Sequence, residues 1–387
     1  MGKRVNPKIT ETYINLGDAL LREDKTQEAA CIFEKASSLE PDNPEIYLKW
    51  GVAFGRDHHL KEAIPLFEKA LAIRPDYPEA QVYWGLLQLL QGNLQAGWPA
   101  YNWRFVFDDY KGKLPYNRAL WEGESLNGKT LLVLGEEGFG DQIQFFRYLP
   151  LIQKKYDCHI IFVTDPVLIT LFQQCQGVDE LIETLHPDIQ YDYFIPIMSL
   201  AKVFNTSLET IPANIPYITP DPDLVSLWKK RMNKKARLQI GLVWAGSPKN
   251  PNNRYRSCRF SDFSVLATLN DVHFYSLQMG PESEQADILP VGMPLTRCDK
   301  NIRDFSDTAA IIQNLDLIIT VDTSMAHLAG ALGIPVWVLL SVRSDWRWLL
   351  EREDSPWYPS MKLFRPTTPH NWDNVMQLVL QTLIHQL

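Results

Sequence analysis

Apolar and small residues at positions 315–340 are spaced as a strand, a helix and a second strand. Residues 317–321 form a short apolar run rich in branched side chains, as expected of a strand buried on both faces. Three candidate helix N-caps follow it: Asp322, Thr323 and Ser324. Gly333 stands where the helix C-cap belongs, and the next apolar run begins at Pro335. A strand–helix–strand unit of this kind predicts a parallel sheet.

The start of this predicted helix, with His327 one turn further on, faces the carboxyl end of the preceding strand. Backbone N–H groups and the helix dipole attract anions at such a position. The alternative is that the polar residues do no more than cap the helix, and the stretch taken alone favours that structural role.

Residues 10–107 repeat themselves with a period of 34 residues. Positions that keep this interval carry small residues, aromatic residues or prolines: Gly17, Gly51 and Gly85; Ala29, Ala63 and Gly97; Phe33, Phe67 and Tyr101; Pro41 and Pro75. Small residues let two helices approach closely, an aromatic ring fills the groove between them, and proline ends the second helix of each unit. This pattern resembles the tetratricopeptide repeat, which has two antiparallel helices per unit.

The third copy departs from the pattern, because Gln81 and Gln88 replace aromatic or apolar residues and Gly97 replaces alanine. We therefore expect a capping repeat that docks on the next domain. Repeat arrays usually bind peptides or other chains on their concave face, and a scaffold that only stabilises its neighbour is an equal alternative. A junction loop is expected at residues 111–116.

Two later segments alternate strands with helices, which predicts two α/β domains with parallel sheets. In the first, a strand at 131–134 leads into a glycine-rich turn, and Asp141 opens an amphipathic helix. The glycines are ordered G-x-x-G-x-G, which is not the dinucleotide fingerprint. An NAD-dependent enzyme is therefore the disfavoured interpretation.

Carboxylates crowd the same turn. The negative charges of Glu136, Glu137 and Asp141 would repel a pyrophosphate. The turn, with its glycines Gly138 and Gly140, is therefore interpreted as the acceptor side of a site, where a general base or a hydroxyl-bearing substrate would lie. The alternative is a tight turn whose helix is capped by Asp141.

The second α/β segment carries the opposite charge. Four cations follow the strand at 239–244 within eleven residues: Lys249, Arg254, Arg256 and Arg259. Guanidinium groups suit phosphate oxygens, and ligands of open α/β sheets bind beyond the carboxyl ends of the strands. The basic loop and the helix start at 322–327 would share that edge, and Gln278, at the end of the next strand, is assigned to the same donor-binding group. Solvated surface charge is the alternative, but four cations so close together favour phosphate binding.

Aromatic residues are dense between positions 344 and 366. Four of them could line a base or sugar pocket: Trp346, Trp348, Trp357 and Tyr358. Packing at a domain interface is the favoured interpretation for each one singly.

Composition narrows the functional classes. The 387 residues are 45% hydrophobic and 22% charged, as in an ordinary globular protein of two or three domains. A net charge of −8 argues against broad binding of nucleic acid or of anionic membranes. Five scattered cysteines without a CxxC motif indicate a reducing compartment rather than a zinc site or a disulfide framework. With no signal-peptide pattern and no membrane-spanning run, we expect a cytoplasmic protein.

Three motifs carry a resemblance to glycosyltransferase family 9, the heptosyltransferases, which have the GT-B fold. They are GFGDQIQFFRYLP (138–150), GLVWAGSP (241–248) and VDTSMAHLAGALGIP (321–335), and the resemblance covers roughly residues 125–387. The chain is closer still to a group of bacterial proteins that fuse tetratricopeptide repeats to such a domain. Segments similar to DWRWLLEREDSPWYPSMKLFR (345–365) recur in that group.

The resemblance implies roles for the site residues. Asp141 occupies the position of the carboxylate proposed as general base towards the acceptor hydroxyl. Arg254 or Arg256 falls near the basic residue that pairs with the donor phosphates. The residues that match the loop and helix start holding the nucleotide diphosphate are Asp322, Thr323, Ser324 and His327. The implied transfer is inverting and metal-independent, with a nucleotide-sugar as co-substrate and no cofactor.

The sequence thus predicts an α + α/β chain of three parts. Tetratricopeptide repeats and a linker occupy residues 1–120, a Rossmann-like acceptor lobe 121–222 and a Rossmann-like donor lobe 223–387. The predicted function is a glycosyltransferase that acts on a protein or glycan acceptor and binds a protein or peptide partner through its repeats. The alternative is a degenerate transferase domain kept as an interaction scaffold.

Overall fold

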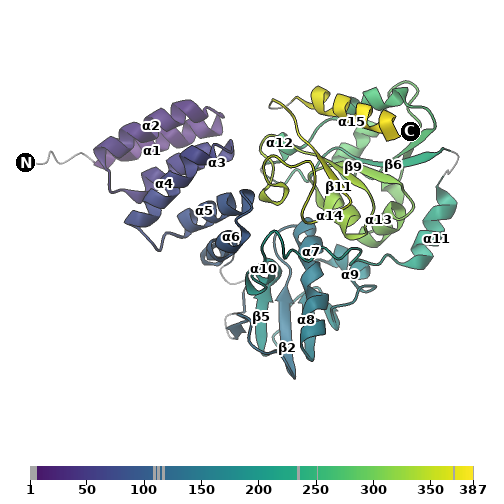
Figure 1. Cartoon of the computed structure of the whole chain (residues 1–387), viewed down its shortest axis with the longest axis horizontal. Helices are drawn as coiled ribbons and strands as arrows, with labels where there is room; N and C mark the ends of the chain where they lie inside the picture. Colours follow the sequence, from purple (N-terminus) through teal and green to yellow (C-terminus); the bar gives the residue numbers. More distant parts are fainter. Residues whose placement is uncertain are drawn as a thin grey trace, which may run out of the picture. The chain divides into compact units, whose positions relative to one another are not determined.

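A computed structural model describes residues 7–107, 110, 114–115, 118–232, 236–250, 252–368 and 371–386. The chain forms two compact units (Figure 1). One consists of Met1–Leu114 with Asp345–Leu350, and the other of Pro115–Ser344 with Glu351–Leu387. Most of the predicted junction loop lies outside the described residues: Lys111, Gly112, Lys113 and Tyr116.

Six helices pair as three hairpins in the described part of the first unit. They are α1 (Pro7–Arg22) with α2 (Thr26–Leu39), α3 (Pro44–Arg56) with α4 (Leu60–Ile73), and α5 (Pro78–Leu90) with α6 (Leu94–Tyr101), followed by the 3-10 helix η1 (Asn102–Val106). The three glycines that keep the 34-residue period all lie in the first helix of a hairpin. The predicted helical repeats are therefore confirmed.

The period reflects a close approach of the two helices in each hairpin. A Cβ atom added to Gly17 would lie 2.4 Å from the ring of Phe33, and one added to Gly51 would lie 2.9 Å from the ring of Phe67. The third hairpin differs, because a Cβ at Gly85 would meet the backbone of α6 at 2.9 Å instead of a ring. Glycine is thus required at these positions because the second helix of the hairpin leaves no room for a Cβ atom.

A segment from far along the chain completes the repeat unit. Asp345–Leu350 contains the 3-10 helix η7 (Trp346–Trp348), which packs on α5. The ring of Trp346 meets the buried ring of Trp98 edge-on, with centroids 5.1 Å apart and planes at 88°. Trp348 is fully buried. The packing interpretation of Trp346 and Trp348 agrees with this arrangement, in which the segment covers the third hairpin as a cap would.

The second unit contains two lobes, each built on a parallel sheet. In the first lobe the strands are β1 (Ala119–Leu120), β2 (Lys129–Leu134), β3 (Cys158–Val163), β4 (Glu180–Ile182) and β5 (Tyr193–Pro196), in the order β1-β5-β2-β3-β4. Its helices include α7 (Phe139–Phe145), α8 (Leu149–Lys155), α9 (Pro166–Phe172) and α10 (Leu200–Val203). Because β3 and β4 lie on one side of β2 and β5 on the other, the connections change direction between β2 and β5.

The second lobe repeats this plan with six strands in the order β11-β10-β9-β6-β7-β8. They are β6 (Leu238–Val243), β7 (Val272–Ser276), β8 (Leu295–Arg297), β9 (Leu317–Val321), β10 (Val336–Leu339) and β11 (Met361–Phe364). Helices α11 (Pro222–Arg231), α12 (Asn253–Arg256), α13 (Phe305–Ile312), α14 (Ser324–Ala331) and α15 (Trp372–Gln386) and the 3-10 helices η4 (Phe260–Thr268) and η5 (Pro281–Asp287) join them. Here the direction of the connections changes between β6 and β9.

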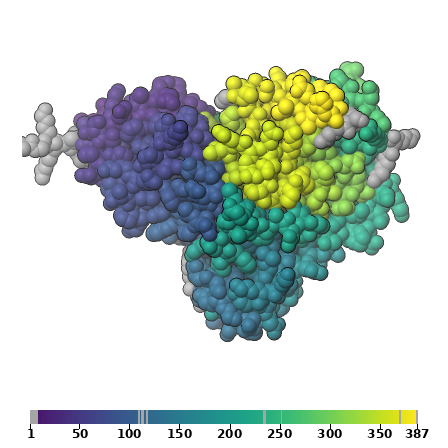
Figure 2. Space-filling view, in the orientation of Figure 1, coloured from purple at the N-terminus to yellow at the C-terminus, as the bar shows by residue number. Residues whose placement is uncertain are grey.

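Burial follows the apolar pattern of the chain. Every residue of β9 is buried, as predicted for a strand covered on both faces. The apolar side of α15, which includes Val375, Met376 and Val379, joins the core formed with Trp244 and Phe260. In the space-filling view this last helix, drawn in yellow, lies on the surface of the second lobe (Figure 2). No helix among the described residues is long and apolar enough to cross a membrane.

The two glycines of α3 provide a direct test of the packing of the repeats. We expect Gly51→Ala to lower the free energy of unfolding by about 1–3 kcal/mol, because its methyl group would overlap the Phe67 ring. Gly55→Ala is the matched control. Its added Cβ would lie 3.8 Å from Leu87, an ordinary contact, so helix propensity should raise stability by up to about 1 kcal/mol. Urea unfolding of both variants would show this opposite sign, and equal effects would contradict it.

Candidate functional site

The turn after β2 forms the acidic side of the candidate site. Glu137 has a left-handed backbone with φ of 57°, which is costly for residues other than glycine and concentrates at functional loops. Glu136 accepts a hydrogen bond from the backbone N–H of Met198 at 3.0 Å, just after β5. The turn is therefore tied to both strands that flank the switch point of the first sheet.

Asp141 lies in the first turn of α7. Its Oδ2 atom accepts a hydrogen bond from the backbone N–H of Gly138 at 2.8 Å, which satisfies a donor that the helix start leaves open. The capping role that the sequence left as an alternative is thus present. The side chain is half-buried, so part of it remains at the surface of the site.

The two lobes meet where α7 packs against α14. A Cβ atom on Gly140 would lie 2.7 Å from Cδ2 of His327 and 3.4 Å from Cα of Ser324. Only glycine fits this contact without a shift of one helix. The structure therefore brings Gly140 of the acidic turn to the start of α14, and Asp141 is its neighbour in the chain.

His327 is buried within this contact. Its Nδ1 atom lies 3.0 Å from the hydroxyl of Tyr358. Burial raises the pKa of Tyr358 well above its ordinary value, so the phenol stays protonated and can share a hydrogen bond with the imidazole. His327 thus bonds to Tyr358 within the second lobe and lies against Gly140 of the first.

Arg147 joins the lobes by a second route. Its buried guanidinium donates to the carbonyl oxygens of Gln144 (2.8 Å), Trp357 (2.8 Å) and Pro212 (3.1 Å). It also donates to the hydroxyl of Tyr217 at 3.1 Å, and its central carbon lies 4.8 Å from the centre of that ring. The planar fork of arginine suits such a set of acceptors.

Arg147 is not among the residues predicted from the sequence, although the sequence contains one signal for it. The residue sits in the apolar stretch QFFRYLP, where a single cation among aromatic residues is unusual for a helix face exposed to solvent. Its partners are up to 210 residues away, so the stretch itself could not identify them.

Helix α14 begins beside the basic loop. Thr323 is the N-cap, and its hydroxyl accepts a hydrogen bond from the backbone N–H of Met325 at 3.2 Å. Asp322 and Ser324 on either side are half-buried. Val243 of β6 pairs with Thr320 of β9, so the basic loop and α14 leave the sheet from neighbouring strand ends. This is the switch point of the second sheet.

Arg256 lies against the backbone of the basic loop. A Cβ atom on Gly246 would lie 2.8 Å from one terminal nitrogen and 2.9 Å from Nε of Arg256. That Nε is buried and has no hydrogen-bond partner among the described residues. A buried donor without an acceptor is costly, and an anionic ligand would satisfy it. Lys249 and Arg259 of the same loop are exposed.

A second aromatic contact organises the cations. The guanidinium carbons of Arg254 and Arg343 lie 4.5 and 4.3 Å from the centre of the Tyr255 ring. Arg343 follows β10 and was missed in the sequence, because nothing in its neighbourhood along the chain links it to the basic loop. The structure thus adds a cation to those predicted from the sequence.

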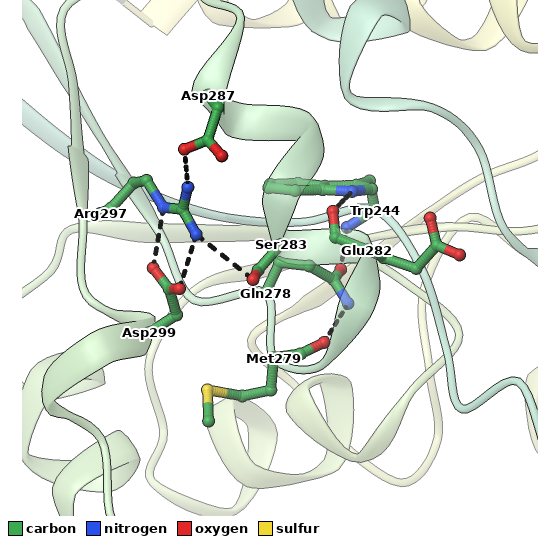
Figure 3. A network of polar contacts seen from close by, with 8 residues as sticks. All are labelled: Trp244, Gln278, Met279, Glu282, Ser283, Asp287, Arg297 and Asp299. Atoms are coloured by element: carbon green, nitrogen blue, oxygen red, sulfur yellow. Dashed lines mark hydrogen bonds and ion pairs between the residues drawn. The ribbon is translucent and has the colours of Figure 1, made fainter.

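Gln278 is fully engaged with the backbone of the second lobe (Figure 3). Its Oε1 accepts from the N–H groups of Trp244 (3.0 Å) and Ala245 (2.8 Å), and its Nε2 donates to the carbonyls of Ala245 and Met279, both at 3.0 Å. The amide therefore shapes the start of the basic loop and would have to give up a bond to contact a ligand.

A neighbouring network holds η5 against the end of β8 (Figure 3). Arg297 donates to both carboxylate oxygens of Asp299 at 3.0 and 2.7 Å, to Ser283 at 3.3 Å and to Asp287. Hydrogen bonding to Arg297 lowers the pKa of Asp299. The indole N–H of Trp244 donates to the carbonyl of Glu282 at 3.1 Å, which ties η5 to the end of β6 as well.

Comparisons with known proteins place the fold. No protein-family model matches the chain. Protein FlbA of Caulobacter vibrioides (strain ATCC 19089 / CIP 103742 / CB 15) is 27% identical over 328 residues, which covers 76% of this chain and 53% of FlbA. The chain thus spans about half the length of the curated relative it matches.

Among solved structures, the glycosyl transferase family 9 protein from Veillonella parvula DSM 2008 has 13% identity and a TM-score of 0.50, and the match covers 68% of this chain and all of that one. The P58(IPK) TPR domain matches 26% of this chain and 29% of its own, with 25% identity and a TM-score of 0.25. The second unit therefore has the GT-B fold of family 9 glycosyltransferases. Together with the helical repeats, this confirms the predicted fold class.

The role of Arg147 can be tested by unfolding. We expect Arg147→Met to destabilise the protein by at least about 3 kcal/mol, since three buried carbonyl groups would lose their donor. Arg147→Lys should recover part of this loss, because the ammonium keeps the charge but not the fork. Arg231→Met is the surface control. It removes only a contact with the Trp228 ring at 5.2 Å and should cost at most about 1 kcal/mol in thermal or urea unfolding.

Proposed function

We propose that the second unit is a glycosyltransferase, which moves a sugar from a nucleoside diphosphate donor to a hydroxyl group of a protein or glycan acceptor. The observation that carries the proposal is the contact of Gly140 with Ser324 and His327. It sets the carboxylate-bearing switch point of one sheet against the cationic switch point of the other. Ligands of open α/β sheets bind at such points.

The donor phosphates would bind on the second lobe. The start of α14 offers backbone N–H groups and the positive end of a helix dipole, and the neighbouring loop offers Arg254 and Arg256. The buried, unsatisfied Nε of Arg256 supports an anionic ligand in particular. We propose Asp322, Thr323, Ser324 and His327 as the frame of this subsite, and Gln278 as the residue that holds its loop.

The acceptor would bind on the first lobe, where Asp141 is the proposed general base. The carboxylate lies one residue from Gly140 and hence close to α14, where the donor would be bound. Glu137 and Gly138 would shape the acceptor loop. A single base towards the acceptor hydroxyl suffices for an inverting transfer, and such a group typically contributes about 10²–10⁴-fold to the rate.

The leaving diphosphate would be stabilised by the cations and the helix start instead of a metal ion. Oriented charges of this kind act on the negative charge that grows on the departing phosphate oxygen. Metal independence and inversion are part of the proposal, and the anomeric configuration of the product, read by NMR, tests the second of them.

The helical repeats would bind a protein or peptide partner, such as the acceptor itself. The competing function is a scaffold whose transferase unit no longer binds a donor. The buried Nε of Arg256, which lacks a hydrogen-bond acceptor among the described residues, favours the enzyme. An anionic donor would satisfy this nitrogen, whereas a scaffold that binds no donor would leave it unsatisfied. The cytoplasmic location stays a prediction of the sequence.

Donor binding can be measured with a panel of ADP-, UDP-, GDP- and dTDP-sugars. We expect one nucleotide to bind with millimolar or tighter affinity in thermal-shift and calorimetric titrations. Arg256→Met should weaken that binding about 10- to 100-fold, as expected for loss of a charged hydrogen bond. The control is Arg352→Met, which removes a surface arginine paired with Asp354 at 2.6 Å. If no nucleotide stabilises the native protein, the scaffold is the better explanation.

Catalysis can be separated from folding with two carboxylates in the same local geometry. Asp141→Asn should reduce transfer about 10²–10⁴-fold while donor binding persists, because the amide can still accept the Gly138 hydrogen bond but cannot take a proton. Asp262→Asn is the control. Asp262 accepts a hydrogen bond from the backbone N–H of Arg259 at 2.7 Å, in the same position of a helix cap as Asp141. The Asp262→Asn variant should therefore transfer sugar at the native rate. Undiminished transfer by the Asp141 variant would rule out its role as base.

A further inference from the structure

Arg343 reaches the basic loop from a different strand. Leu339 of β10 pairs with Val321 of β9, so the chain after β10 leaves the sheet beside the start of α14. From there the Arg343 guanidinium extends over the buried ring of Tyr255, which also carries Arg254. Two guanidinium groups close to one ring repel each other, and cation–π attraction to the ring offsets part of that cost. The arrangement concentrates positive charge at the proposed donor subsite.

A second group at the same edge lacks a partner. Ser341 follows β10 two residues before Arg343 and is 8% exposed. Its hydroxyl is buried and makes no hydrogen bond within the described part of the chain. Together with Nε of Arg256, two buried donors without a partner among the described residues thus lie in the segments that follow β10 and β6, the two neighbours of β9. Unsatisfied buried polar groups need an explanation, and a bound anion would provide one.

The chain enters the repeat unit at Asp345, two residues after Arg343. The chain leaves the second unit after Ser344 and returns at Glu351. One side chain holds both ends of this excursion. Arg365 donates from its terminal nitrogen to Oγ of Ser344 and from Nε to the carbonyl of Arg352, both at 3.1 Å. Arg365 therefore links the residues on either side of the excursion.

Within the repeat unit the excursion is anchored by aromatic packing. The rings of Trp346 and Trp98 meet edge to face, with their centroids 5.1 Å apart, and Trp348 is fully buried. Leu349 is also buried, and its backbone has a left-handed φ of 54°. A left-handed leucine is costly and persists only where surrounding contacts hold it. Trp346 lies three positions after Arg343, with two residues between them, so their Cα atoms are at most about 10 Å apart and the anchor acts on Arg343 through a short segment.

We propose that Arg343 is a further ligand of the donor phosphates, and that Trp98 and Trp346 are positioning residues that hold it in place. The helical repeats thereby set the affinity of the transferase unit for its donor. The inference rests on the proposed function, and it goes further by assigning a role to a residue outside the basic loop and to a pair of residues in the repeat unit.

The first experiment asks whether Arg343 contacts the phosphates. The full chain is titrated with ADP, UDP, GDP, dTDP and inorganic pyrophosphate by calorimetry. Arg343→Met should weaken the tightest nucleotide, and pyrophosphate where it binds, by about 10- to 100-fold. Arg352→Met, the surface control, should bind as the native protein does. Equal affinities of the Arg343 variant and the native protein would overturn the assignment. Failure of the native protein to bind any of these probes would instead overturn the proposed function, and this inference with it.

The second experiment asks whether the repeats position Arg343. Trp98→Ala should raise the donor Kd and KM by about 3- to 10-fold, with little change in kcat once donor is saturating, because the misplaced group acts in binding. Trp98→Phe should restore most of the affinity, since a ring remains for Trp346. Phe33→Ala empties a buried position in the first hairpin and should lower the stability of the repeats without changing donor affinity. Equal donor affinities of the Trp98→Ala and Phe33→Ala variants would show that the repeats do not act on the site. Trp346→Phe, a milder change, serves the same comparison if Trp98→Ala does not fold.

Discussion

The absence of a side chain at residue 140 is the constraint on which the transferase unit depends. A parallel sheet presents its ligand-binding edge only at the carboxyl ends of its strands, and a site between two sheets needs both edges turned towards each other. Gly140 allows this because α7 and α14 approach so closely that a Cβ would lie 2.7 Å from His327. The helix that starts with the acidic turn thus packs against the helix that follows β9, next to the strand that leads into the basic loop.

Hydrogen bonds hold the charged groups around this contact. Arg147 donates to backbone carbonyls on both sides of the interface and to the hydroxyl of Tyr217, which orients a cation between the two lobes. Asp141 accepts a hydrogen bond from the N–H of Gly138, and Glu136 accepts one from the N–H of Met198. Buried polar networks of this kind make the packing of the two lobes more specific.

Local patterns explain most of what the sequence predicted. The 34-residue period and the buried strand at 317–321 are visible in the spacing of residues along the chain. That spacing left three candidates for the helix N-cap, and the structure shows that Thr323 is the cap. Glycines and arginines near strand ends led to the prediction of an acceptor side and a donor side. The missed features depend on distant partners. Arg147 binds the carbonyl of Trp357, 210 residues away, and Arg343 meets the Tyr255 ring, so neither leaves a periodic signal. The hydrogen bonds of the Gln278 side chain could not be predicted from the sequence either, because its partners are backbone groups, which every residue has.

The segment Asp345–Leu350 belongs to the repeat unit although it lies late in the chain. The repeats lie at the start of the chain, yet the residues that cover their last hairpin are supplied after β10. Trp98 therefore packs against a residue that the chain supplies only after β10. A fragment that ends near residue 120 would lack Trp346 and leave the ring of Trp98 without this partner.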